Sequence, residues 1–153
     1  MESVYIETTI ISYLVARPSR DLLVAAHQQM TRDWWDTRKK GFECYISPLV
    51  LAAGDPDVAK RRASAAAEFP VLEVTPEAES LTSAILKSGA IPPNAVGDAG
   101  HVAVATVGNI DYLLTWNCTH LANAQMTRGL FAVCDRQGYT LPVICTPEEL
   151  MGE

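Results

Sequence analysis

Short apolar segments alternate with helix-like segments along almost the whole of this chain, and this alternation constrains the fold more than any other feature. Strands separated by helices pair in parallel, and their helices cover both faces of the sheet. The sequence therefore predicts an α/β fold with a mostly parallel central sheet. The expected strands cover residues 4–7, 42–47, 70–75, 111–115 and 143–145. The expected helices cover residues 9–14, 21–39, 57–69, 76–88, 94–107 and 122–137, with a last helical turn at 146–150.

Several helix ends are marked by residues that favour caps. Asp21 and Thr75 each precede a helix, and Pro76 takes the first helical position after Thr75. Asn94 is expected to cap the helix over residues 94–107. Because that helix is apolar almost all round, we expect it to be buried.

Size and composition are those of one compact unit, and we expect residues 1–153 to form a single domain. Apolar residues make up 48% of the chain and charged residues 20%, which is ordinary for a globular protein. No apolar run is long enough for a membrane span, and the first residues lack a basic stretch followed by an apolar one. We therefore expect a cytoplasmic protein that does not bind membranes.

Cysteine spacing and net charge bear on two kinds of site, a zinc site and a nucleic-acid interface. The four cysteines form no CxxC pair, so we expect free thiols rather than a zinc site. The net charge of −6 argues mildly against binding nucleic acid by bulk attraction. A local cluster can still bind phosphate, and an acidic metal site itself adds negative charge.

Three oxygen-bearing side chains fall where ligands gather in open parallel sheets, beyond the carboxyl ends of the strands. Glu7 ends the first strand, Asn117 follows the strand over residues 111–115, and Asp98 lies in the first turns of the apolar helix. Hard cations such as Mg²⁺ prefer oxygen ligands and keep several waters. These residues are therefore a candidate cation site.

Each of these residues also has a purely structural interpretation. Glu7 could be a solvated strand end, Asp98 could favour the helix dipole, and Asn117 could cap the helix that follows it. The apolar residues around Asp98 favour function there, because an unpaired charge among them is costly. For Glu7 and Asn117 the residues alone leave the choice open.

A set of motifs, in order over nearly the whole chain, resembles a VapC-like subfamily of PIN domains. The motifs are VYIETTIISYL, RPSRDL, the YIS strand, AGDP, VGDAGHVAVA, YLLTWNCTHLANA and VICTPEEL, of which TWNCTHLANA and VICTPEEL are the most specific. The resemblance implies a PIN-like three-layer sandwich of helices around a parallel sheet. It also implies a ribonuclease that depends on Mg²⁺ or Mn²⁺, an RNA substrate, an antitoxin partner and a homodimer.

The acidic positions of that family are only partly kept. Glu7 stands where the first Asp is expected, and its side chain is one methylene longer. Asp98 in GDAGH matches the third acid, and Asn117 in TWN stands at the last acidic position, where Asn is usual for this subfamily. By resemblance, Glu7 and Asp98 are predicted metal ligands, and Asn117 is predicted to join them at the catalytic site.

The second acidic position of the family is missing from this chain. The family places it just after the second strand, in a sequence like SELVLEE, whereas this chain reads SPLVLAAGDP. Pro48, Ala52 and Ala53 supply no carboxylate, and Asp55 belongs to the turn that follows. Two carboxylates can hold one Mg²⁺ with the help of a substrate phosphate, so one metal ion is expected rather than two.

Histidines and tryptophans supply weaker signals. His101 lies one turn after Asp98 and could orient it or contact phosphate, although a packed, hydrogen-bonded histidine is the commoner case. His27 and His120 show no partner pattern. Trp34 and Trp35 are adjacent, so one can be buried while the other is exposed.

Three functions remain open from the sequence, and the first is favoured. It is a metal-dependent ribonuclease in which Glu7 and Asp98 hold the metal and water attacks the phosphodiester. The second is a nuclease-deficient PIN domain that binds an antitoxin, RNA or a second copy, as the missing acid suggests. The third is another α/β domain such as a phosphoacceptor, which would need an Asp at a strand end where this chain has Glu7.

Overall fold

The structure is a computed structural model that describes residues 1–52 and 54–152, so Ala53 in the SPLVLAAGDP segment lies outside the described residues. In chain order, the first elements are β1 (Ser3–Ile6), α1 (Thr8–Val15), α2 (Leu22–Thr37), η1 (Lys39–Gly41), β2 (Glu43–Tyr45) and α3 (Pro48–Ala52). They are followed by α4 (Pro56–Ala65), α5 (Pro76–Ser88), α6 (Val96–Val107), β3 (Tyr112–Leu114), α7 (Ala124–Arg136) and β4 (Val143–Cys145).

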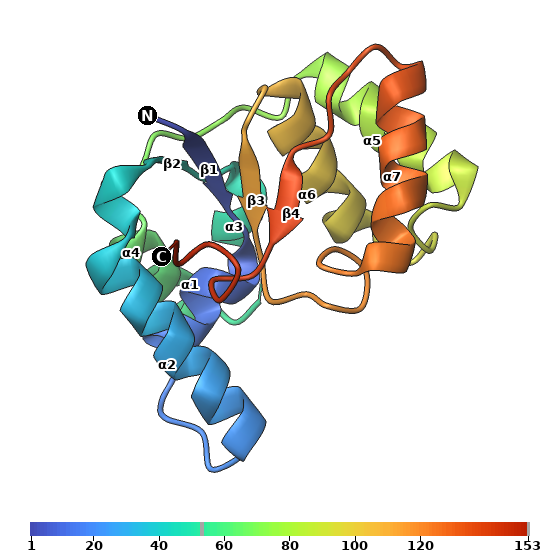
Figure 1. Ribbon diagram of the computed structural model, residues 1–153. Helices are drawn as coiled ribbons and strands as arrows, with labels where there is room; N and C mark the ends of the chain where they lie inside the picture. Colours follow the sequence, from blue (N-terminus) through green and yellow to red (C-terminus); the bar gives the residue numbers. More distant parts are fainter. Residues whose placement is uncertain (53, 153) are drawn as a thin grey trace.

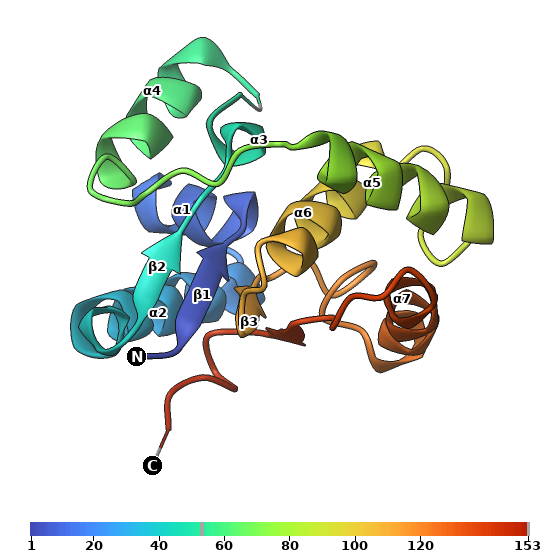
Figure 2. The same cartoon turned by 90° about the horizontal axis from the view of Figure 1, so that it is seen from above.

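The strands form one parallel sheet in the order β2-β1-β3-β4. Figure 1 shows α1, α2 and α4 gathered on one side of the strands and α5, α6 and α7 on the other, and Figure 2 shows the same arrangement from above. Parallel strands need crossover connections, and the helices between them supply these connections. The predicted α/β sandwich around a parallel sheet is confirmed.

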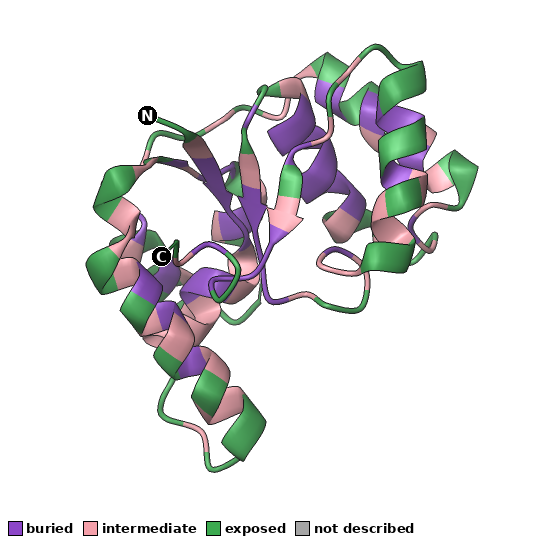
Figure 3. Cartoon of the chain, in the orientation of Figure 1, coloured by how far each residue is buried: buried purple, intermediate pink, exposed green. Residues whose placement is uncertain are grey.

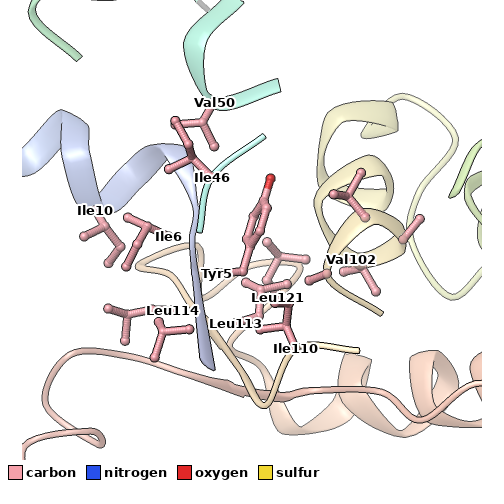
Figure 4. Packing of buried hydrophobic residues seen from close by; sticks show 14 of the residues in the cluster. Tyr5, Ile6, Ile10, Ile46, Val50, Val102, Ile110, Leu113, Leu114 and Leu121 are labelled. Carbon is pink, nitrogen blue, oxygen red and sulfur yellow. The ribbon is translucent and has the colours of Figure 1, made fainter. Parts of the chain in front are cut away.

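The central strand β1 is buried on both faces. Val4, Tyr5 and Ile6 are all fully buried, which is the pattern of a strand covered by helices on both sides. Tyr5 and Ile6 point to opposite faces, with the Tyr5 ring directed toward α6 (Figure 4). A continuous apolar run of this kind fixes β1 in the middle of the sheet rather than at an edge.

The connections reverse direction between β1 and β3. From β1 the chain moves outward to β2, and it then crosses back over β1 to form β3 and β4 on the other side. In open parallel sheets this reversal leaves a crevice at the carboxyl ends of the two strands beside it. Glu7 directly follows β1 and Thr115 directly follows β3, so both residues lie at this switch point.

Helix α6 is buried as its composition predicts. Every residue from Ala99 to Thr106 is buried, and in Figure 3 this helix and the central strand β1 are among the most buried elements, whereas the outer faces of α2 and α7 are exposed. The two neighbouring tryptophans also differ as expected, since Trp34 is fully buried and Trp35 only partly. No helix of the described residues is both long and apolar enough to cross a membrane.

Two local predictions are wrong. Residues 70–75 do not form a strand; only Val71 makes a single parallel bridge, to Ile46. The neighbouring strand β2 is three residues long and turns directly into α3, so it offers no further edge to pair with. Asn94 does not cap α6 either, because Ala95 takes the cap position without a side-chain hydrogen bond.

Candidate functional site

Glu7 is a buried carboxylate that caps helix α1. Its side chain is about 5% exposed, and Oε2 accepts the backbone N–H of Thr9 at 3.1 Å. Oε1 accepts two hydroxyl groups, from Thr9 at 2.6 Å and from Thr115 at 2.5 Å. Hydrogen bonds of this kind and the positive end of the α1 dipole offset the cost of burying the charge.

Backbone N–H groups that follow β3 orient the hydroxyl groups of Thr9 and Thr115 toward Glu7. The backbone N–H of Trp116 donates to Thr9 Oγ1 at 2.8 Å, and that of Asn117 donates to Thr115 Oγ1 at 2.9 Å. Because each hydroxyl oxygen accepts an N–H, its own hydrogen is directed at Glu7. The ends of β1 and β3 are thereby joined through the Glu7 carboxylate, which excludes the interpretation of Glu7 as a solvated strand end.

A second buried polar chain runs beside Glu7. The backbone N–H of Leu49 donates to Ser47 Oγ at 3.2 Å, and Ser47 Oγ lies 2.7 Å from the Tyr5 hydroxyl oxygen. That hydroxyl lies 2.7 Å from His101 Nδ1, and His101 Nε2 lies 3.3 Å from Thr8 Oγ1. His101 is thus a packed, hydrogen-bonded histidine, the commoner of the two cases considered from the sequence.

Glu7 and Asp98 both act on the His101 ring. Burial lowers the pKa of His101, while the nearby charges of Glu7 and then Asp98 raise it, and burial prevails. Burial also raises the pKa of Tyr5, so its phenol keeps the proton that it donates to Nδ1. We therefore assign a neutral ring with hydrogen on Nε2, which lies 3.9 Å from Glu7 Oε2.

Asp98 pairs with a histidine for which the sequence shows no partner pattern. It lies in the first turn of α6, and its Oδ2 is 2.8 Å from Nδ1 of His120, in the loop between β3 and α7. Both side chains are about a quarter exposed, at 24% for Asp98 and 26% for His120. The pair joins residues 22 positions apart on different elements, and no periodicity in the sequence signals such a contact.

Asn117 caps the turn that directly follows it. Its Oδ1 accepts the backbone N–H of His120 at 3.0 Å, while helix α7 is capped by Asn123 instead. The interpretation of Asn117 as the cap of the following helix is therefore wrong, because its side chain caps the turn that precedes α7. The neighbouring Trp116 anchors the same loop, since its Nε1 donates to Thr31 on α2 at 2.7 Å and its ring stacks on His27 at 4.0 Å.

The donor set fits one hard cation at most. Among residues 1–52 and 54–152, no three His, Cys, Asp or Glu side chains gather closely enough to hold a metal ion by themselves. Of the roughly four lone-pair positions on the Glu7 carboxylate, three are taken by the bonds to Thr9 and Thr115. Asp98 uses one, for His120. Mg²⁺ and Mn²⁺ can be held by one or two carboxylates with water and substrate phosphate, whereas a two-metal centre would need more.

The described cysteines offer no further ligand cluster. Cys118 is exposed, the other three are buried, and all four are free thiols, as expected. Burial is the main reason why the pKa of Cys44 is raised to about 11 and that of Cys145 to about 12. These thiols are therefore protonated at neutral pH and are poor metal ligands.

Comparison with known proteins identifies the fold. No family model matches the sequence, and no curated protein matches it either. Among solved structures, the chain is similar to one in the crystal structure of VapBC2 from Rickettsia felis bound to a DNA fragment from their promoter. The match has 13% identity and a TM-score of 0.57, and it covers 94% of this chain and 98% of that one. The likeness shows a PIN-like fold, so the resemblance to VapC-like PIN domains is confirmed at the level of the fold.

Proposed function

We propose that this chain is an endoribonuclease of the VapC toxin type that works with a single Mg²⁺ or Mn²⁺. The observation that supports the proposal is the place of Glu7 at the switch point of a PIN-like sheet, 3.9 Å from the ring of His101 on α6, the helix that carries Asp98 in its first turn. Such crevices bind ligands in open parallel sheets. Carboxylates at such a crevice suit a divalent cation better than they suit a free phosphate.

In this proposal Glu7 and Asp98 are the metal ligands and Asn117 is the neutral oxygen group beside them. The chemistry that a bound divalent cation supplies is activation of water and neutralisation of charge on the phosphodiester. Glu7 offers its remaining Oε2 position, since Oε1 is taken by the threonines. Asp98 offers Oδ1, which makes no hydrogen bond within the described residues. His101 is neutral, and its hydrogen bond with Tyr5 fixes the orientation of the ring beside Glu7.

One partner is suggested by the same comparison, since the similar chain belongs to a VapBC2 complex, and we extend an antitoxin partner to this chain as part of the proposal. The homodimer and the cytoplasmic location rest on the sequence and its family resemblance alone, and they too are parts of the proposal. The RNA substrate is inferred from the resemblance and from the metal site together. The third function considered, a phosphoacceptor, has little support, since Asp98 lies on α6 and not at a strand end.

The alternative is a nuclease-deficient PIN domain that only binds its partner. The extensive hydrogen bonding of Glu7 and the absence of a three-ligand cluster within the described part of the chain favour it. The two proposals differ in whether the protein binds a metal ion and cleaves RNA. A binding module needs neither property.

Calorimetric titration with Mn²⁺ and cleavage of a mixed-sequence RNA separate the two. The ribonuclease proposal expects saturable Mn²⁺ binding and cleavage that stops on removal of the metal, and it expects Asp98→Asn to lose both. Asp135→Asn, which removes the same charge from the exposed end of α7, is the matched control and should retain both. An unchanged cleavage rate in Asp98→Asn would show that the site is wrongly assigned. If the wild type neither binds Mn²⁺ nor cleaves RNA, the ribonuclease proposal is wrong and the binding module is the function that fits.

A further inference from the structure

His120 is the one side chain in the described structure that fixes the Asp98 carboxylate. Its Nδ1 lies 2.8 Å from Asp98 Oδ2, and the Asp98 carboxylate makes no other hydrogen bond or ion pair within residues 1–52 and 54–152. A carboxylate only accepts, so Nδ1 carries the hydrogen and donates it. Without this bond, the side chain of Asp98 would rotate freely in a partly exposed position.

His120 is itself held by the end of β3. Its backbone N–H donates to Asn117 Oδ1 at 3.0 Å, and the next two backbone N–H groups, at residues 121 and 122, donate to the Asn117 carbonyl oxygen at 3.2 and 2.8 Å. The backbone N–H of Asn117 donates to Thr115, whose hydroxyl donates to Glu7. One hydrogen-bonded path thus runs from Glu7 through Thr115, Asn117 and His120 to Asp98.

We infer that His120 is a positioning residue for Asp98. Its effect on the binding of Mg²⁺ or Mn²⁺ rests on the proposed function. The bond to Oδ2 fixes the rotation of the carboxylate and leaves Oδ1 uncommitted. A carboxylate that binds metal usually has its other lone pairs held by such partners. The path from Glu7 further links the placement of Asp98, through His120, to that of the other carboxylate.

Three substitutions at His120 separate this role from direct contact with substrate or metal. Asparagine places an N–H donor near the position of Nδ1, glutamine places one near Nε2, and alanine supplies neither. We expect the Mn²⁺ affinity, measured by calorimetry, to fall about 10- to 100-fold in His120→Ala and His120→Gln. It should stay within about 3-fold of the wild type in His120→Asn, since that variant keeps the bond to Asp98.

Two outcomes of the titration would overturn the inference. One is an affinity that is unchanged or tighter in His120→Ala. The other is recovery by His120→Gln rather than by His120→Asn, which would mean that His120 acts directly through Nε2. Cleavage of RNA by the same variants should follow the order of the Mn²⁺ affinities.

A double-mutant cycle in the metal-free protein tests the contact independently of the proposed function. We measure unfolding equilibrium constants in urea with chelator for His120→Ala, Asp98→Ala and the double variant. The effect of the double variant on this constant should differ from the product of the two single effects by at least about two-fold. The matched cycle of His120→Ala with Asp135→Ala should show independence, because Asp135 lies on α7 and forms no ion pair within the described chain. Independence in the first cycle overturns the assignment. Coupling in a wild type that does not bind Mn²⁺ overturns the proposed function and leaves the His120–Asp98 contact standing.

Discussion

Replacing Thr115 with valine removes a buried hydroxyl and leaves the shape of the side chain nearly unchanged. Thr115 is fully buried, and its Oγ1 donates to Glu7 Oε1 at 2.5 Å while it accepts the backbone N–H of Asn117 at 2.9 Å. The substitution therefore removes one donor from a buried carboxylate and one acceptor from a backbone N–H. Both groups stay in place, so the cost is that of leaving them unsatisfied.

The size of the effect follows from these two bonds. A hydrogen bond to a charged group contributes about 1.5–3 kcal/mol to stability, and Glu7 has almost no access to water that could replace it. The bond from Asn117 adds about 1 kcal/mol or less, since that residue is only partly buried and water can reach it. We expect the free energy of unfolding to fall by about 2–4 kcal/mol, a large share of the 5–15 kcal/mol that is typical of a domain.

Urea unfolding followed by circular dichroism measures this loss. With a denaturant slope of about 2 kcal/mol per molar, the midpoint should drop by about 1–2 M. Thr106→Val is the matched control, because Thr106 is 2% exposed and its hydroxyl has no nitrogen or oxygen partner within the described residues, so at most the weak thiol donor of Cys134 is lost. Its stability should change by less than about 1 kcal/mol. If Thr115→Val costs no more than Thr106→Val, the hydroxyl does not stabilise the Glu7 carboxylate as described.

Three further predictions concern pH, helix packing and thiols. Burial holds the pKa of His101 below its usual value of 6.5, so the unfolded chain binds more protons than the folded one. The free energy of unfolding should therefore fall as the pH drops below about 6.5, by up to about 1.4 kcal/mol per pH unit. In urea titrations at several pH values, His101→Gln should show a smaller change of this free energy with pH, and an identical change would contradict the buried neutral ring. Gly97→Ala should raise the free energy of unfolding by the difference in helix propensity, up to about 1 kcal/mol, because its added Cβ meets nothing within 4 Å. Gly100→Ala should gain less in urea unfolding, since its Cβ would lie 3.0 Å from the Leu49 side chain, and equal gains would argue against that close approach. A thiol reagent should label the exposed Cys118 in the native protein and the three buried thiols only after unfolding, as counted by mass spectrometry, and rapid labelling of a second thiol would refute the burial pattern.

Much of the local structure could be predicted from the sequence because its signals are local. The cap at Asp21, the cap and proline at Thr75 and Pro76, and the apolar helix α6 are each set by residues within a few positions of one another. The segment over residues 70–75 shows the limit of such signals. Its composition suits a strand, but a strand needs a partner edge, and β2 is too short to offer one beyond Ile46.

The sequence by itself determined the fold class and the positions of Glu7 and Asp98 at the end of a strand and the start of a buried helix. Only the tertiary structure decided what surrounds them. The strand order brings the end of β3 beside Glu7, so that Thr115 becomes its donor from 108 residues away, and it brings His120 to Asp98. Periodicity and capping act over a few residues, whereas these contacts depend on which strands lie side by side, and that is settled by packing of the whole chain.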